Sequence, residues 1–365
     1  MKDFLQYGKA SVLLDGQFGS TGKGLAAAYV FEQIRHDMNW DRVICATNAA
    51  PNAGHTTVTK DGQRFVTFHM PTMGVMSPNS MIYLNAGAII DIDLLIKEVK
   101  DLGVNPNRVF IHANAAVITS DHKASEKDNS SSQTKIASTQ KGVGAALAAK
   151  VSRGGEVAKY HSDVLLENGF HLTETSISTY LKSGFAAMVE TPQGMSLSLN
   201  NGFYPYCTSR EVSVSQSLSD AGLHPRDLHK TLMTMRTFPI RVGNITDEDG
   251  NVTGWSGPVY PDQKELSWEE HFPEITPEKT TVTQRVRRIF TFSPTQYHES
   301  LLRLQPDYVH VGFCDYLQSA VDFVNFVDLL RKVEGVAGAD PQRVYSFGPS
   351  TNDVLTYEQA LNKYD

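Results

Sequence analysis

The fold is decided by one stretch of the chain, Leu13-Leu14-Asp15-Gly16-Gln17-Phe18-Gly19-Ser20-Thr21-Gly22-Lys23-Gly24. The apolar run 11–14 predicts a buried strand. A glycine-rich turn that carries a lysine follows, and residues 25–30 are typical of a helix. A strand, a glycine turn and a helix in this order bring backbone N–H groups and a helix N-terminus against phosphate. The stretch therefore predicts a phosphate-binding loop in which Lys23 adds a positive charge.

The loop differs from the common P-loop pattern, G-x-x-x-x-G-K-[ST], at its first and last positions. Gln17 stands in place of the first glycine, and Gly24 replaces the hydroxyl residue that binds Mg²⁺ in that pattern. A P-loop kinase or GTPase would need that hydroxyl and a Walker-B aspartate. The alternative interpretation of the stretch is a glycine turn that only packs a helix on a sheet.

A second polar stretch, Asn52-Ala53-Gly54-His55-Thr56, follows about thirty residues later. Together with the G-x-x-G-K-G turn it resembles the adenylosuccinate synthetase family, which carries a G-D-E-G-K-G loop and an N-A-G-H-T loop in this order. Further segments resemble motifs of that family, also in order: 136–144 with the downstream Arg153, 190–197, 204–209, 241–243, 283–288 and 347–349. The resemblance extends over most of the chain.

The composition is that of a globular protein with an acidic balance. The chain has 365 residues, 41% of them hydrophobic, and a formal net charge of −7. A negative balance argues against general nucleic-acid binding, which needs a basic face. The 3 cysteines are too sparse for a disulfide framework, which favours the cytoplasm, or the host cytoplasm if the protein is viral. No signal peptide and no apolar run long enough to span a membrane are expected.

The pattern predicts an α/β fold, with a central, mostly parallel sheet flanked by helices, in a single domain over residues 1–365. Strands 11–15 and 43–47 with the helix between them form a βαβ unit, which predicts a parallel pair. The remaining predicted strands are 65–69, 80–88, 108–118, 186–190, 309–313 and 343–347, and the remaining predicted helices are 92–99, 145–151 and 320–333. Long surface loops are expected at about 119–135 and 244–275.

The resemblance implies a reaction as well as a fold. The family joins L-aspartate to C6 of a purine nucleotide: a nucleoside triphosphate phosphorylates the purine O6, and the aspartate amine then displaces that phosphate. The family uses Mg²⁺ and works as a homodimer. Because both steps move negative charge, the site needs phosphate-binding groups and proton-transfer groups.

Carried over by motif, the resemblance implies a role for each matching residue. The catalytic residues would be Ser20, Lys23 and His55, with His55 as the general acid and with Ser20 and the Gly54 carbonyl as Mg²⁺ ligands. The triphosphate would bind Gly19, Thr21, Gly22, Lys23, Gly24, Thr56, Asp315, Gly348 and Pro349. The purine monophosphate would bind Ser20, Asn52, Ser138, Thr139, Gln193, Leu197, Thr208 and, from the other subunit, Arg153. L-Aspartate would bind Thr281, Val282, Thr283, Arg285 and Arg287.

The largest departure from the family is Ser20, where the family has an aspartate that takes the proton of purine N1 and binds Mg²⁺. Serine is a poor base, so three interpretations follow: an inactive protein, an enzyme for IMP in which a displaced carboxylate such as Asp15 serves as base, or a changed acceptor. A small hydroxyl leaves room for a 2-amino group, as in dGMP. A viral branch of the family, which condenses dGMP with aspartate, resembles this chain in carrying serine here.

A second departure concerns the triphosphate. The family reads guanine with a segment close to T-K-x-D, and the equivalent here is Gly312-Phe313-Cys314-Asp315. An apolar ring in place of the lysine could stack on a base without selecting guanine, so ATP or dATP is a plausible donor and GTP stays an alternative. Gln140 and Lys141 also replace a glycine and an arginine of the family. A nucleotide-binding protein without catalysis is the alternative from another functional class.

Overall fold

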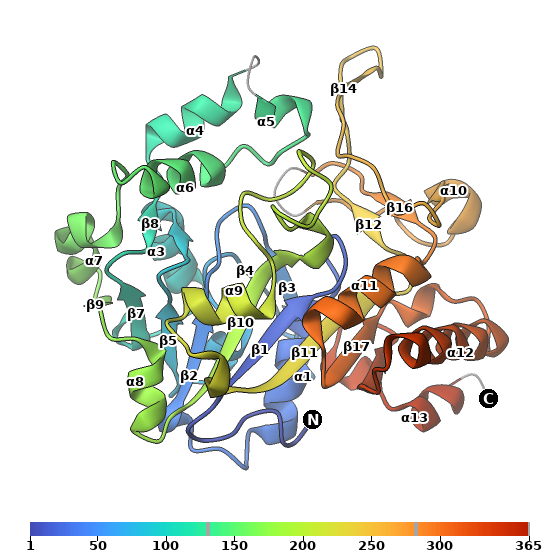
Figure 1. The fold of residues 1–365 in the computed structure, drawn as a ribbon, viewed down its shortest axis with the longest axis horizontal. Helices are drawn as coiled ribbons and strands as arrows, with labels where there is room; N and C mark the ends of the chain where they lie inside the picture. Colours follow the sequence, from blue (N-terminus) through green and yellow to red (C-terminus); the bar gives the residue numbers. More distant parts are fainter. Residues whose placement is uncertain (129–131, 281–283, 364–365) are drawn as a thin grey trace.

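The computed structural model describes residues 1–128, 132–280 and 284–363. Within these residues, the largest sheet has the strand order β19-β18-β17-β11-β1-β10-β2-β5-β7-β9, and every neighbouring pair is parallel except β18 with β19 (Figure 1). Its strands are β1 (Ala10–Asp15), β2 (Val43–Thr47), β5 (Met81–Leu84), β7 (Val109–His112), β9 (His171–Thr173), β10 (Ala186–Gly194), β11 (Leu228–Arg236), β17 (Tyr308–Gly312), β18 (Gln342–Ser346) and β19 (Val354–Leu355). The predicted α/β fold with a mostly parallel sheet is confirmed.

The expected pairing of the first two core strands is wrong. β1 and β2 both run parallel to β10, which lies between them: Ala187 of β10 pairs with Ala10 on one side and Ile44 on the other. The inserted strand comes from much later in the chain, so the local βαβ pattern could not reveal it.

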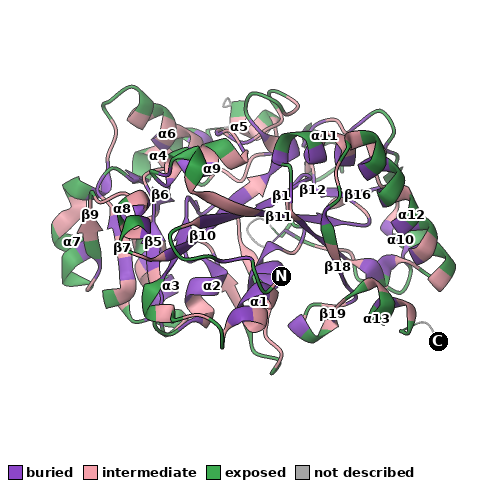
Figure 2. Ribbon diagram, turned by 60° about the horizontal axis from the view of Figure 1, so that its bottom comes forward, coloured by how far each residue is buried: buried purple, intermediate pink, exposed green. Residues whose placement is uncertain are grey.

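Helices cover both faces of this sheet, and the central strand β1 is therefore buried on each side. Leu13 packs with α1 (Lys23–Ile34) and with Met73 of α2 (Thr72–Met76). Val12 and Leu14 face the opposite way, into the core shared with α8 (Ile177–Lys182), α9 (Val214–Asp220), α11 (Pro294–Leu304) and α12 (Ala320–Ala337). Figure 2 shows the purple, buried strands between these two layers.

The segment 119–135, expected to be a loop, is largely helical where it is described. It contains α4 (Ser120–Lys127) and α5 (Ser132–Lys135). Thr119 and His122 cap the start of α4 reciprocally, and Glu126 turns inward to the beginning of α6 (Val143–Val151). The polar composition therefore belongs to a surface helix with an inward-facing carboxylate.

The segment 244–275 is also more ordered than expected. It contains a short hairpin of β13 (Ile245–Thr246) and β14 (Val252–Gly254), followed by β15 (Glu265–Leu266) and α10 (Trp268–His271). β15 joins β16 (Arg288–Phe290) and β12 (Ile240–Arg241) in a small antiparallel sheet. Trp268 is buried against this sheet, so only part of the segment is surface loop.

The remaining strands and helices lie outside these two sheets. The predicted strand 65–69 is shorter, since β4 (Arg64–Thr67) ends where the N–H groups of Phe68 and His69 turn to the Glu98 carboxylate at 2.7 and 2.8 Å. The other elements are β3 (His55–Val58), β6 (Ile89–Ile90), β8 (Ala116–Val117), α3 (Ile92–Asp101), α7 (Ser162–Glu167) and α13 (Tyr357–Leu361). Within the described ranges, no helix combines the length and the apolar character needed to cross a membrane.

Candidate active site

A cavity of about 790 Å³ opens where β1, β2, β10 and β17 end. The carboxyl edge of a parallel sheet is where ligands bind in open α/β folds. Many of the residues predicted from the sequence line this cavity: Gly19, Ser20, Thr21, Gly22, Lys23, Gly24, Asn52, Gly54, His55, Thr56, Ser138, Thr139, Gln193, Leu197, Thr208 and Arg287. Motifs that lie far apart in the sequence thus meet around one space, while the individual roles stay predictions.

Asp15 holds the loop between β1 and α1 from the protein interior, on the side away from the cavity. One carboxylate oxygen accepts the N–H groups of Gln17 at 2.7 Å and Gly19 at 3.3 Å, and the other accepts the Thr21 hydroxyl at 2.5 Å and the Lys23 ammonium at 3.2 Å. Asp15 is fully buried and does not line the cavity. The interpretation of Asp15 as a displaced base for the purine is therefore wrong, because this carboxylate organises the loop instead.

Gln17 and Gly24, the two departures from the common P-loop, each have a structural reason. The Gln17 side-chain amide bonds to the backbone of Arg236 in β11 in both directions, at 3.0 and 3.2 Å. A Cβ on Gly24 would lie 2.5 Å from the Thr57 hydroxyl oxygen and 2.9 Å from the Thr56 carbonyl oxygen. Helix α1 therefore packs directly on β3, and a serine or threonine at position 24 does not fit.

Lys23 and His55 lie close enough to affect each other electrostatically. Lys23 is buried and, besides Asp15, donates to the Gln193 carbonyl at 3.2 Å. Desolvation and the Lys23 charge lower the pKa of His55 to about 3, so the imidazole is neutral at pH 7. Negative phosphate oxygens between the two residues would oppose both causes and favour the imidazolium.

Ser20 has a positive φ of 57° and is exposed to the cavity. Its carbonyl accepts a hydrogen bond from the Arg236 guanidinium at 3.3 Å, so the carbonyl points away from the cavity toward β11. Arg236 was not predicted from the sequence, because β11 was not predicted; this central strand is buried continuously from Thr231 to Arg236.

The end of the cavity predicted for the monophosphate contains Ser138, Thr139 and Thr208, and also Glu126, which was not predicted. The Glu126 carboxylate accepts N–H groups of the first turn of α6 from Gly142 at 2.7 Å and Gly144 at 2.8 Å. This acidic cap occupies the helix N-terminus that would otherwise attract phosphate. Its distance of some 16 residues from α6 in the sequence hid it from motif analysis.

The loop before α6 is held by residues that differ from the family pattern or were predicted elsewhere. The Gln140 side chain donates to the Thr134 hydroxyl at 2.7 Å and so joins the loop to α5. Arg285, predicted to bind aspartate, donates to the carbonyls of Ala137 at 2.9 Å and Ser138 at 3.3 Å. Arg285 does not line the cavity, whereas Arg287 does.

The predicted aspartate-binding residues Thr281, Val282 and Thr283 lie outside the described residues. Beside them, the described residues Lys279 and Val286 form an antiparallel bridge, and the backbone N–H of Arg287 donates to the backbone carbonyl of Glu278 at 2.8 Å. Burial, opposed by Glu278, lowers the pKa of Arg287 to about 10, and the group remains a cation at neutral pH. A partly buried cation beside the cavity suits a carboxylate ligand.

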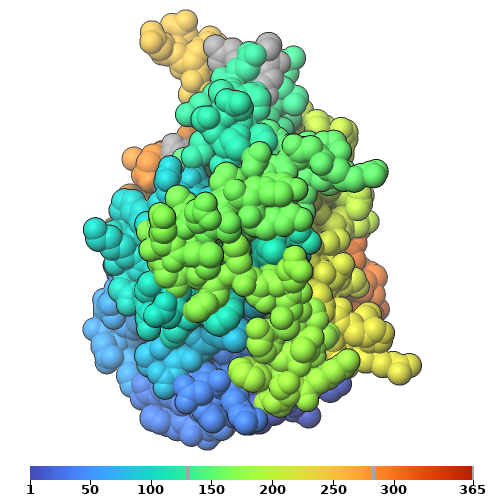
Figure 3. Space-filling view, turned by 90° about the vertical axis from the view of Figure 1, so that its left-hand side faces the viewer, coloured from blue at the N-terminus to red at the C-terminus, as the bar shows by residue number. Residues whose placement is uncertain are grey.

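Several predicted residues lie away from the cavity. Asp315 follows Phe313 in a short turn after β17, while Gly348 and Pro349 follow β18, and none of them lines the cavity. Arg153 is exposed at the end of α6. Figure 3 views the molecule from the side where α7 and β9 lie in Figure 1, and green segments form much of the surface on this side.

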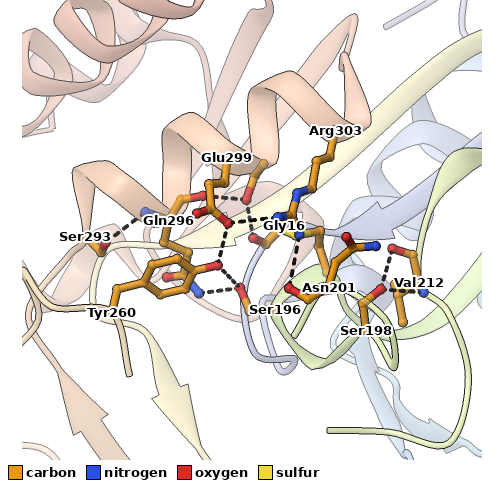
Figure 4. A network of polar contacts seen from close by, with 12 residues as sticks. Gly16, Ser196, Ser198, Asn201, Val212, Tyr260, Ser293, Gln296, Glu299 and Arg303 are labelled. Atoms are coloured by element: carbon orange, nitrogen blue, oxygen red, sulfur yellow. Dashed lines mark hydrogen bonds and ion pairs between the residues drawn. The ribbon is translucent and has the colours of Figure 1, made fainter. Parts of the chain in front are cut away.

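A buried polar network connects α11 to the beginning of the phosphate loop (Figure 4). The Gln296 amide donates to the Ser196 hydroxyl at 2.8 Å, and Ser196 lies 3.3 Å from the Tyr260 hydroxyl. Ser300, also on α11, donates to the Gly16 carbonyl. The aromatic ring of Tyr260 packs against Phe18, which lines the cavity. The network thus fixes the loop from the side opposite to α1.

The comparisons with known proteins agree with this geometry. The family model described as adenylosuccinate synthetase matches residues 12–159 and 156–319. The chain belongs to the adenylosuccinate synthetase family. It is accordingly a ligase of the adenylosuccinate synthetase type.

Similar relatives come from two groups of this family, and those from phages have the higher sequence identity. The chain is 37% identical to an N6-succino-2-amino-2'-deoxyadenylate synthase of Salmonella phage PMBT28, covering 95% of this chain and 97% of the relative. It is 31% identical to an adenylosuccinate synthetase of Methanococcus aeolicus, covering 94% and 98%. The predicted resemblance to the family, and to its viral branch in particular, is confirmed.

A solved structure matches along nearly its whole length. The succinoaminodeoxyadenylate synthetase (PurZ) of cyanophage S-2L, bound to dGMP and to dATP as an energy donor, has a TM-score of 0.83 and 32% identity over 99% of this chain and 100% of that one. The fully ligated adenylosuccinate synthetase of Plasmodium falciparum has a TM-score of 0.77 at 16% identity, which shows a shared fold.

Proposed function

We propose that the protein condenses dGMP with L-aspartate, driven by ATP or dATP, and forms 2-amino-2'-deoxy-N6-succinyladenylate for the synthesis of diaminopurine DNA. The observation that carries this proposal is Ser20 at the cavity, where other members of the adenylosuccinate synthetase family have an aspartate. Support also comes from the phage relatives, one of which binds dGMP and dATP.

The reaction has two steps in which bonds and charges balance. The purine O6 attacks the γ-phosphorus, the bond from that phosphorus to the β,γ-bridging oxygen breaks, and the nucleoside diphosphate leaves with the electron pair while N1 loses its proton. The aspartate amine then attacks C6, the C6–O6 bond breaks, and phosphate leaves as the amine loses a proton. Both transition states gather negative charge, which buried cations and N–H groups stabilise.

Lys23 and His55 serve the first step. Lys23 stands at the first position of α1, where the helix dipole adds to its charge, and it binds the transferred phosphoryl group. His55 becomes protonated when the triphosphate enters and donates a hydrogen bond to the bridging oxygen, so the leaving diphosphate is stabilised as its charge grows. Asp15 holds Lys23 in place from below.

Ser20 selects the acceptor. Its hydroxyl is smaller than a carboxylate and uncharged, so the 2-amino group of guanine can lie beside it and donate a hydrogen bond to it. Inosine has no such group and leaves the position unfilled. Phe313, which also lines the cavity, offers an apolar ring for the donor base, and that favours adenine by stacking without excluding other bases.

The residues present fit a Mg²⁺ ion of the phosphate-bound kind. Among the described residues, no group of three or more acidic, histidine or cysteine side chains could hold a metal by itself. Mg²⁺ in phosphoryl transfer needs only one or two protein oxygens beside phosphates and waters. The Gly54 carbonyl and the Ser20 hydroxyl would supply them, and the ion would neutralise phosphate charge when bound.

The active form is a homodimer in which Arg153 binds the acceptor monophosphate of the neighbouring subunit, beside Ser138 and Thr139. This explains why Arg153 is exposed at the end of α6 instead of lining its own cavity. An exposed arginine with φ 67° is otherwise an unusual choice for a helix end. We place the reaction in the cytoplasm, where free nucleotides are available.

The test is phosphate release with Mg²⁺, L-aspartate and ATP, with dGMP and IMP compared as acceptors and with dATP and GTP then replacing ATP. We expect turnover with dGMP and little with IMP. Turnover with IMP alone would assign ordinary adenylosuccinate synthesis, and no aspartate-dependent release with either acceptor would assign nucleotide binding without catalysis.

A substitution sharpens this test. Ser20→Asp restores the carboxylate and should shift the dGMP-to-IMP ratio of kcat/KM toward IMP by about 10- to 100-fold, because it fills the space of the 2-amino group. Ser20→Ala, which keeps the space, should retain the preference for dGMP. An equal ratio in both variants would show that position 20 does not select the acceptor.

A further inference from the structure

Arg236, the last residue of β11, has a completely buried side chain. A buried guanidinium is costly unless it is paired and hydrogen-bonded. Its partners are the Glu278 carboxylate, through an ion pair and a second contact of 3.2 Å, and the Ser20 carbonyl at 3.3 Å. Although burial opposes ionisation, the Arg236 charge holds the pKa of Glu278 below its usual value.

Two aromatic side chains complete this cluster. The Arg236 guanidinium carbon lies 3.6 Å from the centre of the Phe313 ring, and the Tyr316 hydroxyl donates to Glu278 at 2.8 Å. Phe313 is held with φ 60°, and its carbonyl accepts the Thr237 hydroxyl at 2.6 Å. A guanidinium stacked on a ring at this distance gains cation–π energy and excludes water.

The partners of Arg236 belong to three different parts of the proposed active site. Ser20 belongs to the loop at the acceptor purine, and Phe313 borders the proposed donor-base position. Glu278 precedes the predicted aspartate-binding residues in the chain, and its backbone carbonyl accepts the backbone N–H of Arg287. The Arg236 backbone is itself fixed by the side chain of Gln17.

The charges in this cluster have a consequence for Arg287. Glu278 and Arg236 both act electrostatically on Arg287, Glu278 stabilising its charge and Arg236 opposing it. Because the Glu278 carboxylate forms its ion pair with Arg236, Arg287 is not committed to that carboxylate. Arg287 therefore keeps its guanidinium for a carboxylate that enters the cavity.

We propose that Arg236 is a positioning residue that fixes the Ser20 loop and the backbone at Glu278 and Arg287 relative to each other, and thereby sets both the choice of acceptor base and the affinity for L-aspartate. This inference rests on the proposed function. Arg236 touches no substrate and does not line the cavity, so it acts through Ser20, Glu278 and Phe313.

The test variant is Arg236→Met with Glu278→Gln, which removes both charges together and avoids leaving one of them buried alone. We expect the KM for L-aspartate to rise by about 10-fold or more, and the dGMP-to-IMP ratio to fall by a similar factor, since small displacements in a site have large kinetic effects. Arg236→Lys keeps the charge without the planar guanidinium. Its KM for L-aspartate and its dGMP-to-IMP ratio should lie between those of the double variant and those of the parent protein.

The matched control is Arg108→Lys. Arg108 is a partly buried arginine that, like Arg236, donates to backbone carbonyls, those of Ser77 and Ser80 at 2.7 Å, but it lies away from the cavity. This control should lower the melting temperature and leave the KM and the acceptor ratio unchanged. A uniform fall of kcat in the Arg236 variants, with unchanged KM for aspartate and unchanged acceptor ratio, would overturn the positioning role.

Hydrogen exchange measured without substrates separates this inference from the proposed function. Amides of residues 17–22 and those of 278–280 and 284–287 should both exchange faster in the double variant, while those of β3 should not. Faster exchange in only one of the two segments would refute the coupling. If the parent protein releases no phosphate with aspartate, the proposed function fails, and the exchange result still decides whether Arg236 couples the two segments.

Discussion

Helices α1 and α6 both begin directly after a glycine in the left-handed conformation, Gly22 with φ 86° and Gly142 with φ 82°, and neither glycine provides a side-chain cap. At α1 the first helical residue is Lys23, and the surrounding turn faces the cavity. At α6 the Glu126 carboxylate binds the first N–H groups. One helix N-terminus is thus open to an anion, and the other already holds one.

The difference shows that a glycine turn before a helix does not by itself make a phosphate site. The N–H groups and the helix dipole are the same at both ends. Whether a helix N-terminus is available to phosphate depends on whether another part of the chain already supplies a carboxylate to it. For α6 that carboxylate is Glu126 of α4. Under the proposed function, we therefore expect the acceptor phosphate to bind through the side chains beside α6, such as Ser138 and Thr139, and not at its N-terminus.

The largest effect is expected from Lys23→Met, which removes the positive charge from the open N-terminus. We expect kcat/KM to fall by about 10³-fold, because the charge stabilises the transferred phosphoryl group most in the transition state. The matched variant is Lys141→Met, which removes an exposed lysine directly before Gly142 at the closed N-terminus. The kcat/KM of this variant should fall by less than about 10-fold. Equal losses in steady-state assays would mean that the two termini do not differ in function.

Asp15→Asn is expected to have the next largest effect. It leaves the Lys23 ammonium buried without a charged partner, which should lower the free energy of unfolding by about 3 kcal/mol. In this variant a triphosphate analogue should raise the melting temperature more than in the parent protein, because phosphate replaces the lost carboxylate as the partner of Lys23.

The pH profile of the same variant tests the rejected alternative. If Asp15 were the base for the purine, Asp15→Asn would remove the acidic limb of the kcat profile. We expect that limb to remain, with a lower kcat at every pH, since the carboxylate faces the loop and not the cavity.

The open N-terminus could be predicted from the sequence, and the closed one could not. Lys23, the glycines around it and Asp15 lie within one short segment, so a local motif contains all of these residues of the proposed phosphate-binding loop. The same holds for His55 in its own motif. These predictions depend on contacts between neighbours in the sequence, for which spacing is informative.

Residues that act across the fold were missed. Glu126 lies in a polar segment predicted to be a loop, and Arg236 lies in a strand that was not predicted. Likewise, the insertion of β10 between β1 and β2 follows from packing over the whole sheet. Such contacts depend on tertiary structure, which a single sequence without an alignment does not show.

Glu126→Gln would partly open the second N-terminus and should have a moderate effect. The amide oxygen still accepts a hydrogen bond, but the charge at the helix dipole is lost, so we expect a loss of about 1–2 kcal/mol in the free energy of unfolding. Inorganic phosphate at millimolar concentration should restore part of this loss. Urea unfolding with and without phosphate measures this increase in the free energy of unfolding. An equal increase in the parent protein would contradict the view that the Glu126 carboxylate already occupies the N-terminus of α6.

The smallest effect, a change of protonation without any substitution in the site, is expected at His55. Its pKa is about 3 in the empty protein, against an ordinary value of 6.5, because of desolvation and the Lys23 charge. The neutral imidazole therefore contributes stability that is fully present above pH 6.5 and is lost as the pH falls toward 3. A bound triphosphate places negative charge between His55 and Lys23, so the pKa of His55 should rise.

Proton NMR of the imidazole C2 position follows this change, with His55→Gln used to assign the signal among the 12 histidines of the chain. In the free protein the signal should not titrate between pH 5 and 8, and with a non-hydrolysable triphosphate it should begin to titrate. Lys23→Met should raise the pKa of His55 in the free protein as well, since it removes one of the two causes. A His55 signal that titrates near its ordinary pKa in the free protein would show that the open N-terminus does not control this imidazole, and the contrast between α1 and α6 would then be limited to their hydrogen bonds.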